Sequence, residues 1–450
     1  MSEVIRIRRG LDIKLSGKAE KILNDSERPL LYAVKPSDFI GILPKLTVVP
    51  GDMVKIGSQL FFDKKHPEVK FTSPVSGKIV EILRGERRSI LAVVVESDGK
   101  DDYIEFIKAD PSGLPREKVI EVLLNSGMWP TIRQRPYSVI ANPENLPKSI
   151  FISGFDTAPL APDYNFIVKD YVSEFQKGID VLKILTKGKV HLSLNGDNEI
   201  PPAYSNTSGI EIHKFSGPHP AGNVGIQIHH IDPINKGDIV WYIGPYDVIR
   251  IGKLFMNGRV DNTSFLAVTG SEVKKPQYLK IIRGTCISTL LKDNLKSGDL
   301  RFISGNVLTG TKIEKNGFLG FYDNQLTVIP EGKYYDFLGW LLPGLGKYSV
   351  SRTFFSWLTP NKEFKIDTNL KGGLRSYVIT GQYEKVLPMD IYPVQLIKAI
   401  LAEDVDKMEK LGIYEVAEED FALCEFVCTS KIEVQSILRK GIDLMKKEME

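Results

Sequence analysis

Two of the chain's three cysteines lie close together near its end, in the stretch FALCEFVCTS at 421–430. Thiolate-bound iron–sulfur clusters usually take four cysteines, and structural zinc usually takes four protein ligands. Cys286 is far away in the sequence, so counting ligands argues against a cluster or a metal site here. Phe421, Cys424 and Cys428 have the spacing i, i+3 and i+7, which predicts one stripe of a helix. We therefore expect Cys424 and Cys428 to be structural, buried as small hydrophobic side chains.

The segment SGMWPTIRQRPYS (126–138) combines arginines with aromatic residues. Arg133 and Arg135 could bind a phosphate or a carboxylate through their planar guanidinium groups. Trp129 and Tyr137 could sandwich a planar ring. The same residue types are favoured at protein contacts, so the segment predicts either a ligand-binding loop or an interface loop.

The segment GPHPAGNVG (217–225) directly follows an expected strand at 209–215. In an open α/β sheet, ligands bind at the carboxyl ends of the strands. Glycines such as Gly222 let the backbone approach a ligand closely. His219 lies between two prolines and could donate to a carbonyl or phosphate oxygen. The alternative is a rigid turn that packs against the next domain.

Two further motifs are rejected on their residue types and spacing. GLGKYS (344–349) lacks the first glycine of a phosphate-binding loop, and its lysine precedes Tyr348 rather than serine or threonine. The adjacent His229 and His230 have no third ligand at metal spacing. As strand neighbours they would also point to opposite faces. No metal site is therefore predicted.

The composition is that of a soluble globular protein and excludes some partners. The 450 residues suggest about three domains of ordinary size. With 59 basic and 56 acidic residues the net charge is +3, too balanced to indicate binding to nucleic acid. No apolar run approaches the roughly 20 residues that span a bilayer. We therefore expect no transmembrane segment in this chain.

The hydrophobic pattern divides the chain into four units. Residues 1–101 show short strands separated by turns that contain proline and glycine, which is all-β patterning. Residues 102–255 alternate strand and helix patterns, which favours a parallel α/β sheet. Residues 256–330 form a smaller α+β unit, and 331–450 a connector followed by amphipathic helices. The expected fold class is therefore multidomain α/β and α+β.

Two segments of the first unit, VVPGDMVKIGSQLFF (48–62) and FTSPVSGKI (71–79), resemble the biotinyl/lipoyl carrier fold. The carriers hold a lysine flanked by methionines on the hairpin between these halves. Here that hairpin reads DKKHPEVK (63–70) and has no such flanks. We therefore expect the fold without the modification.

A wider resemblance is carried by segments along nearly the whole chain: IRIRRGLDIKLSGKAEK (5–21), FTSPVSGKI (71–79), SGMWPTIRQRPYS (126–138), GPHPAGNVGIQIHHIDPI (217–234), VWYIGPYDVIRIGKLF (240–255), FLGFYDNQLTVIPEG (318–332), GWLLPG (339–344) and ALCEFVC (422–428). In these segments the sequence resembles the A-subunit family of the bacterial sodium-translocating NADH:quinone oxidoreductase. The resemblance implies a barrel-sandwich (biotinyl-like) domain at 1–101, a Rossmann-like domain at 102–255, a ubiquitin-like domain at 256–330 and a connector with a C-terminal helical domain at 331–450.

The same resemblance implies a place in a larger assembly. The chain would be a peripheral subunit on the cytoplasmic face of the bacterial inner membrane, bound to the other subunits of a six-subunit pump. That complex passes electrons from NADH to quinone and exports sodium ions. Its flavins and iron centres would belong to other subunits.

The architecture is also similar to the flavin- and NADH-binding subunit of respiratory complex I and to the C subunit of the Rnf complex. Those relatives have a glycine-rich loop after the first strand of the Rossmann-like domain and a cysteine-rich cluster motif in the helical domain. Here GMWPTIRQRP (127–136) stands in place of the loop, and only Cys424 and Cys428 remain of the cluster motif. We therefore expect no tightly bound cofactor and no iron–sulfur cluster in this chain.

The predicted function is a contribution to quinone access or reduction, or to assembly of the complex, by a chain that is inactive when isolated. A quinone site needs an apolar slot, aromatic walls and donors for the carbonyl oxygens. The residues expected to supply these are Trp129, Arg133, Arg135, Tyr137, His219 and Gly222. The alternatives are a dehydrogenase subunit that binds flavin and NADH, or a pure scaffold subunit.

Overall fold

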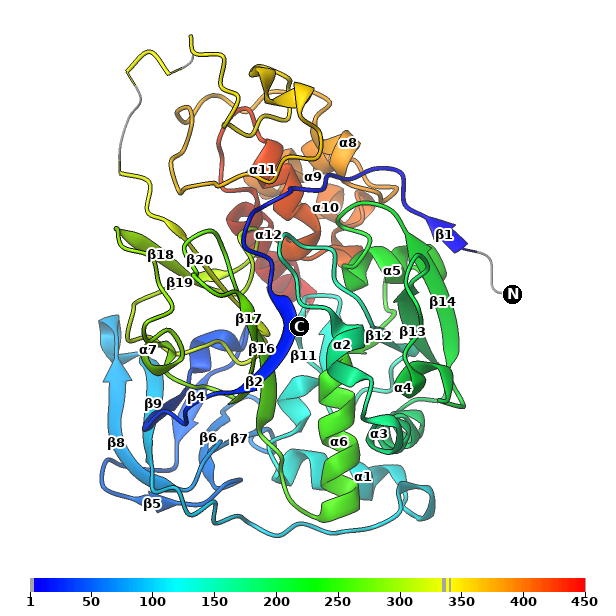
Figure 1. Ribbon diagram of the computed structural model, residues 1–450. Helices are drawn as coiled ribbons and strands as arrows, with labels where there is room; N and C mark the ends of the chain where they lie inside the picture. Colours follow the sequence, from blue (N-terminus) through cyan, green and yellow to red (C-terminus); the bar gives the residue numbers. More distant parts are fainter. Residues whose placement is uncertain (1–3, 334–336, 340, 450) are drawn as a thin grey trace.

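The computed structural model describes residues 4–333, 337–339 and 341–449, which form a mixed α/β protein (Figure 1). Among these residues there are four β-sheets. A helical unit, orange and red in Figure 1, lies above the two larger sheets, and the two small sheets lie at the lower left. Within the described residues, no helix is both long enough and apolar enough to span a membrane.

The N-terminal unit is a barrel-sandwich of two small antiparallel sheets, which confirms the expected fold of this unit. The strands, in sheet order, are β3 (Leu31–Val34), β9 (Ile90–Ser97), β8 (Gly77–Arg84) and β5 (Met53–Val54), and then β4 (Pro44–Leu46), β6 (Gln59–Asp63) and β7 (Lys70–Thr72). Phe61, Phe71 and Val95 come from both sheets and share one core, because alternate residues of a strand face the same side. The expected hairpin at 63–70 connects β6 to β7.

The seven-stranded sheet has the order β1-β14-β13-β12-β15-β10-β11. Its strands are β1 (Val4–Arg6), β14 (Glu211–Ser216), β13 (Lys189–Asn195), β12 (Ser149–Ser153), β15 (Val240–Ile243), β10 (Arg133–Arg135) and β11 (Val139–Ile140). β1, β14, β13, β12 and β15 are parallel to one another. At one edge β10 pairs antiparallel with β15, and β11 pairs antiparallel with β10. The central strands β12 and β15 are almost entirely buried, as is usual where helices cover both faces of a parallel sheet.

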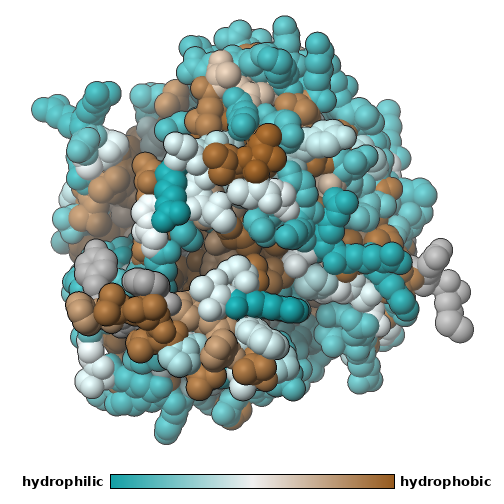
Figure 2. All heavy atoms as spheres, turned by 90° about the horizontal axis from the view of Figure 1, so that it is seen from above, coloured by the Kyte–Doolittle hydropathy of each residue, from teal (hydrophilic) through white to brown (hydrophobic). Residues whose placement is uncertain are grey.

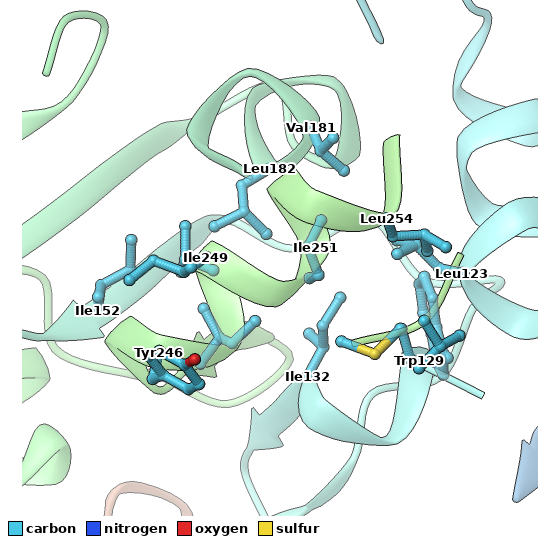
Figure 3. Packing of buried hydrophobic residues seen from close by; sticks show 14 of the residues in the cluster. Leu123, Trp129, Ile132, Ile152, Val181, Leu182, Tyr246, Ile249, Ile251 and Leu254 are labelled. Carbon is cyan, nitrogen blue, oxygen red and sulfur yellow. The ribbon is translucent and has the colours of Figure 1, made fainter. Parts of the chain in front are cut away.

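Helices cover both faces of this sheet. They are α1 (Arg116–Asn125), α2 (Tyr164–Val168), α3 (Val172–Leu185), α4 (Pro202–Ser205), α5 (Val224–Ile231) and α6 (Pro245–Asn257). On one face Ile152 of the sheet shares a core with Ile249 of α6 (Figure 3), and on the other Phe151 packs with Val224 of α5. Helices α3 and α6 approach so closely that a Cβ at Gly252 would lie 1.9 Å from a carbonyl oxygen of α3. Only glycine fits at that crossing.

The six-stranded sheet has the order β19-β18-β20-β16-β17-β2. Its strands are β19 (Thr311–Ile313), β18 (Leu300–Ser304), β20 (Gln325–Pro330), β16 (Thr263–Thr269), β17 (Gln277–Ile282) and β2 (Glu20–Asp25). A short helix, α7 (Ile287–Leu290), lies beside it. Leu266, Val268 and Leu326 form part of a core of their own on this sheet.

The C-terminal unit is helical. Its helices are α8 (Tyr383–Val386), α9 (Pro393–Leu401), α10 (Val405–Lys410), α11 (Ala422–Val427) and α12 (Val434–Met449). The expected single helical stripe from Phe421 to Cys428 is wrong at its end, because α11 stops at Val427 and Cys428 has an extended backbone.

The beginning of the chain does not stay within the N-terminal barrel-sandwich. Strand β1 pairs with β14 in the seven-stranded sheet, and β2 pairs with β17 in the six-stranded sheet. The first strands therefore connect the two larger sheets before the chain enters the sandwich. The domain boundaries after residues 101, 255 and 330, and the Rossmann-like and ubiquitin-like assignments, stay predictions.

Candidate functional site

A cavity of about 150 Å³ lies at the carboxyl edge of the seven-stranded sheet. The segments that follow β12, β14 and β15 contribute Asp156, His219 and Gly244 to its lining. Arg133 of β10 and Glu419 of the helical unit also line it. The strands of a parallel sheet end at the same edge, so residues far apart in the sequence meet there.

The guanidinium of Arg133 lies between two aromatic rings. Its Cζ atom is 4.6 Å from the centre of the Tyr242 ring and 4.4 Å from the centre of the Tyr322 ring. Such cation–π contacts hold a guanidinium without using its N–H donors. In the described part of the chain, the guanidinium forms no hydrogen bond and no ion pair. Its donors are therefore available to a ligand in the cavity that Arg133 lines.

His219 is buried and is held from two sides. Its backbone N–H donates to Asp12 Oδ1 at 2.9 Å, and its Nδ1 lies 3.1 Å from Thr157 Oγ1. Burial lowers the pKa of His219 to about 4, so the imidazole is neutral at neutral pH. Thr157 Oγ1 accepts a hydrogen bond from the Gly222 N–H at 2.9 Å. The hydroxyl hydrogen is then free to be donated to His219 Nδ1, which leaves the proton of the ring on Nε2.

Gly222 allows the loop after β14 to lie directly on the loop after β12. A Cβ at this position would lie 2.6 Å from the backbone nitrogen of Thr157 and 2.9 Å from the Cα of Asp156. Ser153 Oγ also donates to the Gly222 carbonyl oxygen at 2.9 Å. The absence of a side chain is therefore needed to bring His219 beside the carboxyl end of β12.

Asp156 supplies a carboxyl group that can hold a proton. Burial raises its pKa to about 6, although its Oδ1 accepts a hydrogen bond of 2.8 Å from the Ala158 N–H, which favours the charged form. The nearby Glu419 also raises the pKa of Asp156. A carboxyl group in this range is partly protonated close to neutral pH and can donate a proton.

Comparisons with known proteins identify the family. Family models match residues 5–98 ("NqrA N-terminal barrel-sandwich hybrid domain"), 114–260 ("NqrA second alpha/beta domain") and 265–315 ("NQRA C-terminal domain"). The A subunit of the Na(+)-translocating NADH-quinone reductase of Neisseria gonorrhoeae is 39% identical over 449 residues, which cover 99% of this chain and 100% of that one. This chain belongs to that family of A subunits.

Other A subunits match equally completely. Those of Rhodopirellula baltica and Hahella chejuensis are 38% and 40% identical, covering 99% of this chain and 98% and 100% of their own lengths. A solved NAD+-reducing NiFe hydrogenase in the air-oxidized state aligns at 10% identity with a TM-score of 0.38, over 75% of this chain and 64% of the hydrogenase chain. A TM-score that low carries no conclusion about the fold.

The six residues of this chain that were expected from sequence to bind a ligand do not all meet. Arg133, His219 and Gly222 line the cavity together. Trp129 is fully buried instead, packs edge-to-face against Trp241 and donates its indole N–H to the Ala141 carbonyl oxygen at 2.7 Å. Its ring is part of the core (Figure 3).

Arg135 and Tyr137 do not line this cavity. The Arg135 side chain is fully buried and pairs with Asp420 and Glu419 at 2.7 and 2.8 Å. Tyr137 lines a different cavity, of about 520 Å³, and its carbonyl oxygen accepts from Arg439 Nη1 at 2.9 Å. The segment 126–138 is therefore divided between a part that lines the cavity and a part that contacts the helical unit.

The two cysteines near the C-terminus are buried free thiols. They lie in the core of the helical unit with Phe421, Val434 and Met445. Burial raises the pKa of the Cys424 thiol well above its ordinary value. A buried protonated thiol is unreactive.

The adjacent histidines lie on a helix, α5, so the expectation that they are strand neighbours is wrong. The Nδ1 of His229 lies 2.8 Å from Glu415 Oε2, and its Nε2 accepts from the Asp390 N–H at 3.1 Å. The Nδ1 of His230 lies 2.8 Å from the Ile226 carbonyl oxygen. Both rings therefore serve local structure and contacts with the helical unit.

The lining residues that sequence reasoning missed include Asp156, Tyr242 and Glu419. Asp156 follows the apolar strand SIFIS by a few residues, and the rule that ligands bind at carboxyl strand ends could have found it. Tyr242 is part of a strand that is apolar throughout, and Glu419 comes from a distant unit. No pattern in the sequence around Tyr242 or around Glu419 indicates that either residue lies near Arg133.

Proposed function

We propose that this chain is a peripheral subunit on the cytoplasmic face of a sodium-pumping NADH:quinone oxidoreductase in the bacterial inner membrane, and that its cavity binds a quinone headgroup. Proteins of its family are named as A subunits of a Na(+)-translocating NADH-quinone reductase. The observation that supports quinone binding most is the guanidinium of Arg133, which is held between Tyr242 and Tyr322 with its donors available to the cavity.

The size of the cavity supports a single ring as the ligand. Its volume is about 150 Å³, and an engineered protein cavity of about 150 Å³ binds benzene. Pockets for drug-sized ligands and cofactors measure about 300–1,000 Å³. The cavity is smaller than those pockets, which favours a single ring over a whole flavin or nicotinamide dinucleotide.

The donors lining the cavity match the two carbonyl oxygens of a quinone. Arg133 donates to one oxygen through its guanidinium, and His219 donates to the other through Nε2–H, the tautomer that Thr157 favours. Both donors bind a reduced oxygen more strongly than a neutral carbonyl oxygen, because negative charge develops there. The site therefore favours the reduced forms of the headgroup.

Reduction of a quinone to a quinol takes two electrons and two protons. The electrons come from NADH through the redox groups of the other subunits of the complex. Asp156, with a pKa raised to about 6 by burial, supplies one proton to a reduced oxygen and regains it from solvent. The second proton comes from solvent.

Titration calorimetry tests this function by measuring how tightly the purified full chain binds a ubiquinone with a single isoprene unit. Arg133→Gln keeps a polar side chain but removes the charge, and a hydrogen bond to a charged group contributes about 1.5–3 kcal/mol. We therefore expect affinity to fall by about tenfold or more. Arg259→Gln is the matched control, since Arg259 also stacks on a ring, that of Tyr103 at 5.4 Å, away from this cavity. Equal affinity of Arg133→Gln and the wild type would exclude the site.

A scaffold function is the second candidate, and exposed apolar side chains support it. Leu341, Leu374 and Ile379, between β20 and α8, are 61%, 76% and 62% exposed. Figure 2 looks onto this end of the molecule and shows hydrophobic groups among the hydrophilic ones. Exposed apolar surface of this kind marks contacts with other proteins, here a membrane-bound subunit of the complex.

Co-purification with the membrane subunits tests the scaffold function. Leu374→Asp with Ile379→Asp should release the chain from the solubilised complex while leaving its quinone affinity unchanged. Leu30→Asp is the control, because Leu30 is 60% exposed in the N-terminal barrel-sandwich. Retention of the double variant in the complex would contradict a contact at this surface.

A further inference from the structure

Two histidines and a glutamate meet on the face of the seven-stranded sheet that α5 covers. His191 of β13 pairs with Glu211 of β14, and Ser193 pairs with His213. Alternate residues of a strand point to the same face, so the side chains of His191, Glu211 and His213 lie on one face. That is the face of Phe151, whose ring stacks on the His191 ring with 4.6 Å between centroids. The cluster lies near the amino ends of these strands, away from the cavity that contains Arg133.

The distances within this cluster suit a common ligand. His191 Nδ1 is 2.9 Å from His213 Nε2 and 3.7 Å from Glu211 Oε2, and one ligand atom from each residue lies within 4.8 Å of the others. Zinc–nitrogen and zinc–oxygen bonds are about 2.0–2.2 Å long, which places neighbouring ligand atoms about 2.9 Å apart at a right angle and about 3.4 Å apart in a tetrahedron. The observed separations span these values, so small side-chain movements suffice to place an ion at the centre.

Neighbouring residues orient the ligand atoms. The other carboxylate oxygen of Glu211, Oε1, pairs with Lys189 at 2.6 Å, which leaves Oε2 on the side of the histidines. Burial lowers the pKa of His191 to about 4 and also lowers the pKa of His213, so both rings are neutral at neutral pH. Neutral imidazole and ionised carboxylate are the forms that bind metals.

The cluster is accessible from one side. His191 is 4% exposed, whereas the Glu211 side chain is 44% exposed. An ion can therefore enter from solvent and keep a water molecule as a fourth ligand. Two imidazoles and one carboxylate form a ligand set that suits Zn²⁺ and related divalent transition metals rather than Mg²⁺ or Ca²⁺.

We propose that His191, Glu211 and His213 bind one divalent transition-metal ion of the Zn²⁺ class, which connects β13 to β14. The site is separate from the proposed quinone cavity and does not depend on it. An ion held by two neighbouring strands stabilises the folded chain, because a preformed site does not exist in the unfolded state.

Metal titration of the tag-free full chain, after treatment with EDTA, tests the proposal. Zn²⁺ binding is followed by calorimetry, and Co²⁺ binding by the visible absorption that imidazole-bound Co²⁺ gives. We expect one ion per chain and a Tm that rises with added Zn²⁺. His213→Gln and Glu211→Gln should each lower the affinity by about tenfold or more and remove the rise in Tm.

The control variant is His66→Gln, because His66 also lies beside a carboxylate, with Nδ1 3.5 Å from Glu68 Oε1, and both side chains are 40% exposed. It should bind metal as the wild type does. If His213→Gln fails to fold, Glu211→Gln still tests the site. Glu211 lies at the surface, so its substitution should leave the fold intact. Absence of a one-to-one complex in the wild type, or unchanged affinity in folded His213→Gln and Glu211→Gln, would overturn the proposal.

Discussion

Arg135 of β10 and Asp420 of the helical unit form an ion pair with 2.7 Å between Nη1 and Oδ2, and neither side chain is exposed to solvent. The same guanidinium binds the Glu419 carboxylate at 2.8 Å and the Glu415 carbonyl oxygen at 3.0 Å. The edge of the seven-stranded sheet and the helical unit are therefore joined by a buried charge network. This contact also positions Glu419 at the cavity that Arg133 lines.

Arg135→Met should lower the free energy of unfolding by about 3–5 kcal/mol, because it leaves Asp420 buried without its partner. Urea denaturation followed by circular dichroism measures the change. Arg28→Met is the matched control, since Arg28 pairs with Asp101 at 2.8 Å with side chains 61% and 45% exposed. An exposed pair contributes less than about 1 kcal/mol. Equal stability of Arg135→Met and the wild type would contradict the network's role.

Asp156→Asn should change how stability depends on pH. The pKa of Asp156 is raised by burial from 3.8 to about 6 in the folded chain, so between these values the folded state binds more protons than the unfolded state. The contribution of the Asp156 carboxyl group to the free energy of unfolding is fully present below pH 4 and is lost as the pH rises through 6. Between pH 4 and pH 7 the free energy of unfolding of the variant should therefore rise relative to that of the wild type by up to about 3 kcal/mol. Urea denaturation at a series of pH values measures this difference. If the free energies of unfolding of the variant and the wild type changed with pH in parallel, the prediction would be contradicted.

His219→Gln should have the opposite effect over nearly the same pH range. Burial lowers the pKa of His219 from 6.5 to about 4, so the unfolded state binds more protons than the folded state between these values. Stability from the neutral ring is present above pH 6.5 and is lost as the pH falls through 4. The wild type should lose up to about 3 kcal/mol relative to the variant from pH 7 to 4. The same denaturation series measures it, and a slope of the same sign as for Asp156→Asn would disprove the assignment.

Gly222→Ala should destabilise the chain by about 1–3 kcal/mol, since the new methyl group overlaps backbone atoms that cannot rotate away. The nearest is the Thr157 nitrogen, 2.6 Å from the Cβ position. Gly113→Ala is the control, because nothing lies within 4 Å of its Cβ position. Thermal denaturation compares the two variants. An unchanged Tm in Gly222→Ala would contradict the prediction, because it would show that the loops after β12 and β14 can move apart without loss of stability.

Cys424→Ser should lower the free energy of unfolding by about 1–3 kcal/mol, because it buries a hydroxyl group without a strong partner. The Cys424 sulfur lies 4.0 Å from the Tyr383 carbonyl oxygen, which is a weak contact. Cys286→Ser should cost less, since Ser288 Oγ lies 3.2 Å from the Cys286 sulfur. Quinone reduction by an assembled complex that contains Cys424→Ser should be unchanged, and its loss would reopen a redox role for this cysteine.

Several features could be predicted from the sequence because their signals are local. The helix α12 and the hairpin between β6 and β7 follow from side-chain periodicity and turn residues, and both are confirmed. The site was predicted only in part. Arg133 and Arg135 differ by two positions and share a strand, yet one lines the cavity and the other is paired in the interior. Both residues are arginines, so only their contacts in the folded chain distinguish the role of Arg133 from that of Arg135.

The sequence by itself determined the family and the order of strand and helix patterns, because both are read from residues that are neighbours along the chain. Only the tertiary structure decided which polar residues share a cavity. Tyr242 and Tyr322 hold the Arg133 guanidinium from positions far along the chain, and His191 meets His213 across two strands. Such contacts depend on strand order and helix packing, and no local pattern specifies them.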